Sequence, residues 1–291
     1  MSVGAMPIHP SQTAQEIMQH NNAIGMFMGL FIGDTLGAPL EFTEPNTGNP
    51  LKDMVGGGVH ETSPGEWTDD GAMAMAIADA YLAYKRIAPG AIAQNFKQWR
   101  NSGTFGTRGY CFDIGNTTAE ALSASSNKRP YGGSCAFMTD GNGSLMRLAP
   151  HILFNHNNKT MAVADSVAGG LITHGTGNCI AYTAQLAAEL FDGTAIGDQS
   201  LFDKGIKEES GTVMGCYASA WQSICATSSF EDALIHAVNK GGDADTVGAV
   251  TGMIAGRIYG YNAIPKRWLA ALVQHDQLLV TADKLYTMGD K

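Results

Sequence analysis

Two carboxylates and one hydroxyl lie within four residues of the chain, at a predicted junction between a loop and a helix. The residues are Asp243, Asp245 and Thr246, and the apolar stretch that follows, residues 247–260, is typical of a helix. Hard divalent cations such as Mg²⁺, Mn²⁺ or Ca²⁺ prefer oxygen ligands of this kind. Taken alone, the segment is equally typical of a capped turn without a metal, because Asp and Thr favour helix starts.

A second hydroxyl and two further carboxylates stand at another predicted helix start, in Thr68, Asp69 and Asp70. Helix capping is again the simplest alternative, since the helix dipole favours acids in a first turn. Adjacent acids repel each other unless a cation lies between them and their partners. If the fold brings the two clusters together, six oxygen donors surround a space that suits two cations. Pairs of cations of this kind orient substrates and activate water.

Four other segments carry polar residues at turns or helix ends, and each has a structural alternative. Glu41 follows a predicted helix, where a loop carboxylate can reach a site but is more often solvated. Residues 113–118 have the composition of an Asx turn with a Thr cap. Residues 141–144 leave backbone amides near a helix start, which suits phosphate or ribose, although Asn-Gly is also the commonest turn dipeptide. His174 stands at a helix end, where a structural hydrogen bond is the usual role.

Two predicted helices must position these residues, and both carry glycine at every fourth place. The glycines are Gly25, Gly29, Gly33 and Gly37 near the N-terminus, in a helix expected from residue 12 to about 35, and Gly248, Gly252, Gly256 and Gly260 near the C-terminus. Each glycine inside a helix costs about 1 kcal/mol relative to alanine. A spacing of four places each set on one face, so we expect the two faces to pack closely at the centre of the protein. A membrane dimerisation motif is the alternative, and Arg257 and the shortness of both stretches argue against it.

Helical spacing dominates the rest of the chain, and few segments alternate as strands do. Further helices are expected at residues 70–86, 89–99, 117–124, 144–151, 159–173, 177–191, 213–226, 230–239 and 265–279, with Ser11 as the cap of the first helix. No change of composition marks a linker, so we predict one all-α domain over residues 1–291, of which 1–10 form a flexible N-terminal segment. Residues 38–66 form a long loop, and loops of that length are usually functional.

Composition limits the partners and the compartment. The 291 residues are 44% hydrophobic and 15% charged, which suffices for a large buried core. The formal net charge of −9 and the lack of a basic run disfavour nucleic acid or an anionic membrane as partners. The five cysteines form no CxxC pair and no signal peptide is recognisable, so we expect a reduced, cytoplasmic protein, and a monomer, without a membrane span.

The order of the motifs is more specific than any one of them. Along the chain they are Gly-Asp-x-x-Gly-Ala-Pro-x-Glu-Phe, Trp-Thr-Asp-Asp, Asp-x-Gly-Asn-Thr-Thr, Gly-Asn-Gly-x-x-Met-Arg, Thr-His-Gly and Asn-x-Gly-Gly-Asp-Ala-Asp-Thr. This series, over residues 24–260, resembles the ADP-ribosylglycohydrolase family, and residues 113–118 look most like its bacterial branch, the dinitrogenase reductase-activating glycohydrolases. The resemblance implies a single compact orthogonal multi-helix bundle with two divalent cations, Mg²⁺ or Mn²⁺, in a cleft.

The resemblance also implies a role for each candidate residue. The ligands of one cation would be Thr68, Asp69 and Asp70, and those of the other Asp243, Asp245 and Thr246, with Asp245 able to bridge. Asp113 would be the catalytic carboxylate near the scissile bond, and Glu41 a mobile acid that gates or assists catalysis. The residues that bind ADP-ribose would be Asn116, Gly141, Asn142, Gly143 and His174.

The predicted reaction is hydrolysis of the glycosidic bond between ADP-ribose and an acceptor, with mono-ADP-ribosylated arginine on a protein as the first choice. An oxocarbenium-like centre needs nearby carboxylates, and cations that bind vicinal hydroxyls can fix the ribose. One alternative is a hydrolase of O-linked or small-molecule ADP-ribose conjugates. Another is a non-catalytic ADP-ribose-binding regulator, which the complete set of acids disfavours. A structural Ca²⁺-binding protein is disfavoured because the chain has no EF-hand loop.

Two positions depart from the family pattern. Gly71 follows Trp-Thr-Asp-Asp where the family usually has Thr, which removes a hydroxyl near the cations. Residues 210–213 stand where members often carry Gly-Tyr-Val, and the missing aromatic could change how the ligand stacks. Tyr217 lies nearby in the sequence, and whether it replaces that aromatic is left open.

Overall fold

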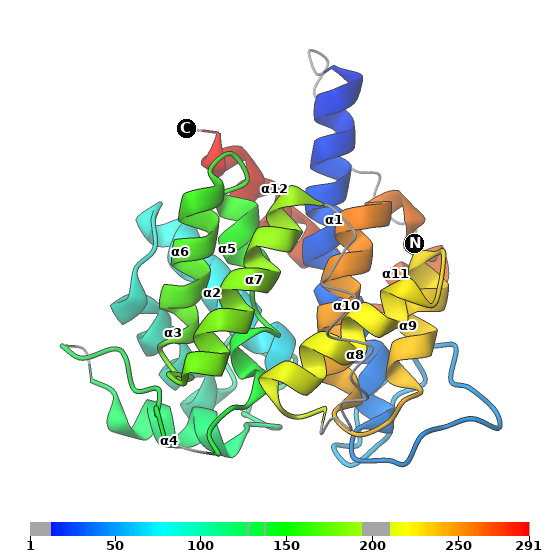
Figure 1. The fold of residues 1–291 in the computed structure, drawn as a ribbon, viewed down its shortest axis with the longest axis horizontal. Coiled ribbons are helices and arrows are strands. Elements are labelled where there is room, and N and C mark those ends of the chain that lie inside the picture. Colours follow the sequence, from blue (N-terminus) through cyan, green and yellow to red (C-terminus); the bar gives the residue numbers. More distant parts are fainter. Residues whose placement is uncertain (1–12, 127, 137, 194–209, 291) are drawn as a thin grey trace.

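The computed structural model describes residues 13–126, 128–136, 138–193 and 210–290. The expected flexible segment 1–10 and the expected cap Ser11 lie outside these ranges. Inside them the chain forms twelve α-helices with short 3-10 turns, and its β pairing is confined to isolated bridges (Figure 1). The prediction of an all-α fold is confirmed.

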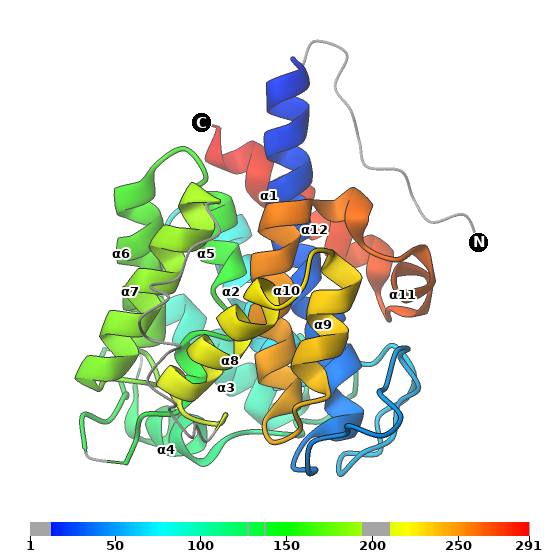
Figure 2. The same cartoon turned by 45° about the vertical axis from the view of Figure 1, so that its right-hand side comes forward.

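Two helices stand at the centre and the others surround them. The helices are Ala14–Gly37 (α1), Asp69–Tyr84 (α2), Pro89–Ser102 (α3), Asn116–Ala124 (α4), Ala149–Phe154 (α5), Lys159–Gly170 (α6), Gly177–Asp192 (α7), Val213–Cys225 (α8), Phe230–Val238 (α9), Ala244–Tyr259 (α10), Lys266–Ala271 (α11) and His275–Gly289 (α12). Figures 1 and 2 show α1 beside α10, with α2, α3, α5, α6 and α7 on one side and α9 and α11 on the other.

Helix α1 begins at a complete capping box. The side chain of Thr13 accepts a hydrogen bond from the backbone N–H of Glu16, and the Glu16 carboxylate accepts one from the backbone N–H of Thr13. Two backbone donors that would otherwise lack partners are satisfied in this way. The helix then continues without interruption to Gly37.

Helices α1 and α10 approach each other along their glycine faces. A Cβ atom built on Gly29 would lie 2.0 Å from the carbonyl oxygen of Gly252, and one on Gly33 would lie 1.9 Å from that of Gly248. Both distances are far below van der Waals contact, so a larger residue would force the two backbones apart. The prediction that the two glycine faces pack together at the centre of the protein is confirmed.

The apolar composition of α1 follows from this central position. The segment Glu16–Leu40 has the length and the mean hydropathy, 1.4, of a helix that could span a membrane. Of its most apolar window, 89% is buried inside the protein. The core helix of a folded domain satisfies the same test of length and composition, so a single helix of this kind is weak evidence for a membrane span.

The prediction of a single helix over residues 265–279 is wrong. The chain forms α11 and α12 there, and between them Gln274 has a φ of 60°, in the left-handed region. The backbone N–H of Val273 donates to the carbonyl oxygen of Gly65 over 2.9 Å, which holds this break against the long loop. Helix α12 then continues ten residues beyond the predicted end at residue 279.

The helix predicted at residues 144–151 begins later than expected. A 3-10 turn over Asn142–Ser144 comes first, and α5 starts only at Ala149. Pro150 occupies the first turn of α5, where its missing N–H is not needed. The turn therefore stays outside a regular helix, and its residues Asn142 and Gly143 line the cleft described below.

Candidate active site

The two acidic clusters meet where α2 and α10 begin. Thr68 Oγ1 donates to Asp245 Oδ2, and Thr246 Oγ1 donates to Asp70 Oδ1, each over 3.3 Å. Each cluster thus supplies the hydroxyl that binds a carboxylate of the other. The predicted meeting of the two clusters is confirmed, and their binding of cations stays a prediction.

The clusters border a cleft with a volume of about 720 Å³, a size suited to a nucleotide-like ligand. Among the residues that line it are Glu41, Asp69, Asp113, Asn116, Gly141, Asn142, Gly143, His174, Asp243, Asp245 and Thr246. Of the predicted site residues only Thr68 and Asp70 are absent from the wall, and both are buried and hydrogen-bonded to residues that line it. The fold therefore brings the whole predicted set to one place.

Burial and mutual repulsion disfavour the charged forms of these acids. Burial raises the pKa of Asp69, Asp70 and Asp245 well above the ordinary value, and neighbouring carboxylates raise it further. Burial, followed by the charges of Asp113 and Asp243, raises the pKa of Glu41 to about 9. A group of acids arranged in this way is stable in its charged form only when cations neutralise it.

Unpaired oxygen atoms show where such cations fit. Asp70 Oδ2, Asp113 Oδ2 and Asp245 Oδ1 are buried and have no hydrogen-bond partner among the described residues. Oxygens of Asp245, Asp69 and Asp113 lie within 4.8 Å of one another, and another set within 4.8 Å joins Asp245 to Glu41 and Asp243. The donors are all hard oxygens, so this chain has acidic clusters that could bind Mg²⁺ or a similar cation.

His60 is a site residue that the sequence did not single out. Its Nε2 atom lies 2.9 Å from Asp113 Oδ1 and 3.0 Å from Glu41 Oε2, so the ring stands between the two predicted catalytic acids. Burial raises the pKa of Asp113, and the proximity of His60 counteracts part of that increase. Asp113 has a φ of 56°, a left-handed conformation that is uncommon outside glycine and occurs at functional sites. The only signal for His60 was its place in the long loop expected to be functional.

Asn142 lines the cleft and also contacts Asp243, a predicted metal ligand. Its side-chain amide donates to Asp243 Oδ2 over 2.8 Å, and the backbone N–H of Asp243 donates to Ser210 Oγ over 2.7 Å. Asn142 therefore orients the carboxylate of Asp243, and Ser210 holds the backbone of the same residue. Asn116, at the first position of α4, is exposed and lines the cleft without a polar contact of this kind.

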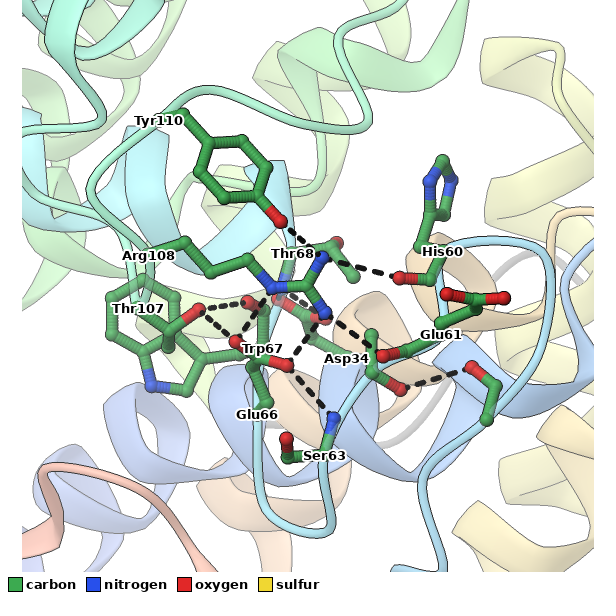
Figure 3. Close-up of polar contacts among 12 residues, drawn as sticks. Asp34, His60, Glu61, Ser63, Glu66, Trp67, Thr68, Thr107, Arg108 and Tyr110 are labelled. Carbon is green, nitrogen blue, oxygen red and sulfur yellow. Dashed lines mark hydrogen bonds and ion pairs between the residues drawn. The ribbon is translucent and has the colours of Figure 1, made fainter.

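Asp34 supports the first acidic cluster from α1. Its carboxylate accepts the backbone N–H of Thr68 over 2.9 Å and that of Gly71 over 3.0 Å, and so caps the start of α2 (Figure 3). Burial raises the pKa of Asp34 to about 7, while these N–H groups oppose the increase. Asp34 is the second residue of the motif Gly-Asp-x-x-Gly-Ala-Pro-x-Glu-Phe, but it was not predicted as a site residue. Its position connects α1 directly to the residues that precede Asp69.

Arg108 joins the two loops that carry His60 and Asp113. Its guanidinium group donates to both carboxylate oxygens of Glu66 over 2.8 Å, and to the carbonyl oxygens of His60 and Glu61 over 3.2 and 3.1 Å (Figure 3). The same group lies 4.2 Å from the ring centroid of Phe112. Only a planar group with several donors can satisfy all these partners at once.

The comparison with protein families agrees with this geometry. The family model described as ADP-ribosylglycohydrolase matches residues 15–201 and 198–291. The chain belongs to the ADP-ribosylglycohydrolase family. A solved structure titled "ADP-ribosylglycohydrolase-related protein complex" superimposes with a TM-score of 0.82 at 32% identity, and the match covers 94% of this chain and 99% of that one.

Two curated members of the family are similar over most of their length. The ADP-ribosylarginine hydrolase Tri1 of Serratia proteamaculans is 32% identical, over 92% of this chain and 80% of that protein. The ADP-ribosyl-[dinitrogen reductase] glycohydrolase of Rhodospirillum rubrum is 28% identical, over 87% of this chain and 90% of that protein. The predicted resemblance to the ADP-ribosylglycohydrolase family, and within it to the dinitrogenase reductase-activating type, is therefore confirmed.

The structure bears on both departures from the family pattern, Gly71 and the aromatic residue missing at residues 210–213. A Cβ atom on Gly71 would lie 2.7 Å from the ring of Trp67 and 2.9 Å from that of Phe31, so packed aromatic rings leave no space for a threonine here. Tyr217 donates to Glu189 Oε1 over 2.7 Å and is absent from the cleft wall. Tyr217 therefore does not supply an aromatic ring to this cleft.

Proposed function

We propose that this protein hydrolyses the N-glycosidic bond between ADP-ribose and an arginine side chain of a protein, with two divalent cations, Mg²⁺ or Mn²⁺, held by the two acidic clusters. The observation that carries the proposal is the reciprocal pairing of Thr68 with Asp245 and of Thr246 with Asp70 beside Asp113 in one cleft. Arginine is favoured as the acceptor because relatives from two bacteria are named ADP-ribosylarginine hydrolase. We expect the protein to act in the cytoplasm and as a monomer.

The reaction breaks the bond from the anomeric carbon to the guanidinium nitrogen, and water supplies a hydroxyl group to that carbon and a proton to the departing nitrogen. When bound, the cations supply Lewis acidity and positioning for the ribose hydroxyls and the water. Burial raises the pKa of Asp113, which favours a role for this carboxyl as the group that gives or takes a proton. His60 lies 2.9 Å from Asp113 and holds it beside Glu41, so both acids face the same part of the cleft.

Hydrolysis of defined conjugates tests the proposal. The protein is incubated with an ADP-ribosylarginine peptide, a serine-linked peptide and a small O-linked conjugate, and free ADP-ribose is measured by chromatography. We expect release from the arginine peptide, loss of release with a chelator, and recovery with Mg²⁺ or Mn²⁺. Release only from O-linked substrates, or binding of ADP-ribose without any release, would contradict the proposal and favour one of the two alternatives.

Arg108→Lys is expected to lower kcat for the arginine peptide about 10- to 100-fold, the range typical of residues that orient a catalytic group. Lysine cannot reproduce the two bonds to Glu66 together with those to the His60 and Glu61 carbonyls. Affinity for Mg²⁺, measured by calorimetry, should change little because Arg108 contacts neither acidic cluster within the described part of the chain. The control is Arg86→Lys, since among the described residues Arg86 donates only to the neighbouring Ile87 carbonyl. An unchanged kcat in Arg108→Lys would show that the two loops hold their positions without this group.

A further inference from the structure

Arg147 is a fully buried cation next to the cleft, with 1% of its surface exposed. One terminal nitrogen of its guanidinium group donates to Thr173 Oγ1 over 2.6 Å, and the other lies 3.6 Å from the sulfur of Met73. An arginine side chain has donors and no acceptor. The direction of the short bond is therefore fixed, and Thr173 Oγ1 must be its acceptor.

The hydroxyl proton of Thr173 then needs an acceptor, and the described residues offer one. Thr173 is completely buried, and within the described residues its hydroxyl has one other hydrogen-bond partner, His174 Nδ1 at 2.8 Å. A buried hydroxyl proton without a partner is costly, so this proton lies between Thr173 and His174. Nδ1 is consequently the acceptor, and a neutral His174 ring carries its single proton on Nε2.

The Nε2 edge of His174 borders the part of the cleft formed by the Gly-Asn-Gly turn. A Cβ atom on Gly141 would lie 3.1 Å from Nε2, and one on Gly143 would lie 2.6 Å from Cε1, so glycines leave the space that the ring occupies. His174 is 97% buried and lines the cleft, and within the described parts of the chain Nε2 has no hydrogen-bond partner. Burial, followed by the charge of Arg147, lowers the pKa of His174 to about 3, so the ring stays neutral.

We propose that Arg147 and Thr173 are positioning residues that hold His174 in the Nε2–H tautomer, so that its ring donates one hydrogen bond to an oxygen of ADP-ribose in the cleft. The identity of the ligand rests on the proposed function, whereas the tautomer does not. A neutral donor of fixed tautomer suits this site, because it binds a phosphate or hydroxyl oxygen equally at every working pH. The arrangement also gives the buried guanidinium group of Arg147 a hydroxyl acceptor next to the cleft.

The first test measures the tautomer in the ligand-free protein. Long-range ¹H–¹⁵N NMR reports protonation of each ring nitrogen, and the His174 signals are assigned by their loss in His174→Gln. We expect Nδ1 without a proton and Nε2 with one, unchanged between pH 6 and pH 9. A proton on Nδ1 in the wild-type protein would overturn the proposal, whatever the protein hydrolyses.

The second test removes the hydroxyl that relays the effect of Arg147. Thr173→Val is expected to move the two ring-nitrogen signals toward each other, as two tautomers mix, and to weaken ADP-ribose binding about tenfold, the loss of one hydrogen bond. Thr173→Ser keeps the hydroxyl and should restore both properties. If Thr173→Val kept the ring-nitrogen signals and the affinity of the wild type, the contact of Arg147 through the Thr173 hydroxyl would not be what positions His174.

The third test asks which edge of the ring the ligand uses. Glutamine places an amide N–H near the position of Nε2, whereas asparagine reaches only as far as Nδ1, so His174→Gln should retain more affinity for ADP-ribose than His174→Asn by calorimetry with Mg²⁺. If His174→Asn binds both ADP and ADP-ribose more weakly than the wild type does, the oxygen that accepts the hydrogen bond belongs to the phosphates. If it binds only ADP-ribose more weakly, that oxygen belongs to the terminal ribose. Equal affinity of the two variants would contradict donation from Nε2. If the wild type binds neither compound, the proposed function fails while the NMR result still decides the tautomer.

Discussion

Asp245→Asn is expected to reduce turnover of the ADP-ribosylarginine peptide by about 10³-fold or more, the scale of losing a central electrostatic group of an active site. Oxygens of Asp245 lie within 4.8 Å of those of Glu41 and Asp243 in one set, and of Asp69 and Asp113 in another. One of its two oxygens has no hydrogen-bond partner among the described residues. No other acid belongs to both of these sets, so its loss should weaken Mg²⁺ binding in calorimetry together with kcat.

The same substitution should stabilise the protein without cations. Burial, followed by the charge of Asp243, raises the pKa of Asp245 well above its ordinary value. The folded state then binds the proton more tightly than the unfolded state, so stability falls as pH rises above the ordinary pKa of about 3.9. Asparagine removes this dependence, and in chelator at pH 8 the Tm of Asp245→Asn should exceed that of the wild type. With saturating Mg²⁺ the order should reverse, since the wild type binds the cation more tightly and gains more stability from it.

Asp276→Asn is the matched control, because the Asp276 side chain is 92% exposed and belongs to none of the described carboxylate sets. Its Tm, its Mg²⁺ affinity and its kcat should remain close to those of the wild type. Full turnover in Asp245→Asn would refute the central role of Asp245. A lower Tm in chelator would show that the carboxylate is stabilised by interactions other than bound cations.

Much of this site was predictable because its signals are local. Glycine at every fourth residue defines a face of a helix without knowledge of its partner, and the sequence contains two such faces that pack together, as in Gly29 and Gly252. The pairs of acids beside Thr68 and Thr246 are recognisable for the same reason, since oxygen donors within four residues share one loop. These features depend on the spacing along the chain and not on the path of the loops.

The supporting residues were not predictable because they depend on loop geometry. His60 reaches Asp113 across 53 positions of the chain, and neither residue lies in a segment with a regular period. Nothing in the sequence distinguishes Arg108 from the other six arginines until its bonds to the His60 and Glu61 carbonyls are known. Gln274 likewise gives no signal of a left-handed conformation, so the break between α11 and α12 was missed.

Gly33→Ala should lower the free energy of unfolding by about 3 kcal/mol or more, at the upper end of overpacking effects. Alanine is intrinsically better in a helix by about 1 kcal/mol, but here its Cβ would lie 1.9 Å from the carbonyl oxygen of Gly248. Chemical denaturation measures the loss. Gly177→Ala in α7 is the control, because a Cβ there meets no atom within 4 Å.

The substitution should also weaken Mg²⁺ binding in the fraction that stays folded. Asp34 follows Gly33 in α1 and holds the N–H of Thr68, whereas Asp245 lies in the first turn of α10. The separation of α1 and α10 therefore sets the distance between Thr68 and Asp245, which are 3.3 Å apart across the two acidic clusters. If Gly33→Ala were as stable as Gly177→Ala and bound Mg²⁺ like the wild type, the close approach of the glycine faces would not be what holds the two clusters together.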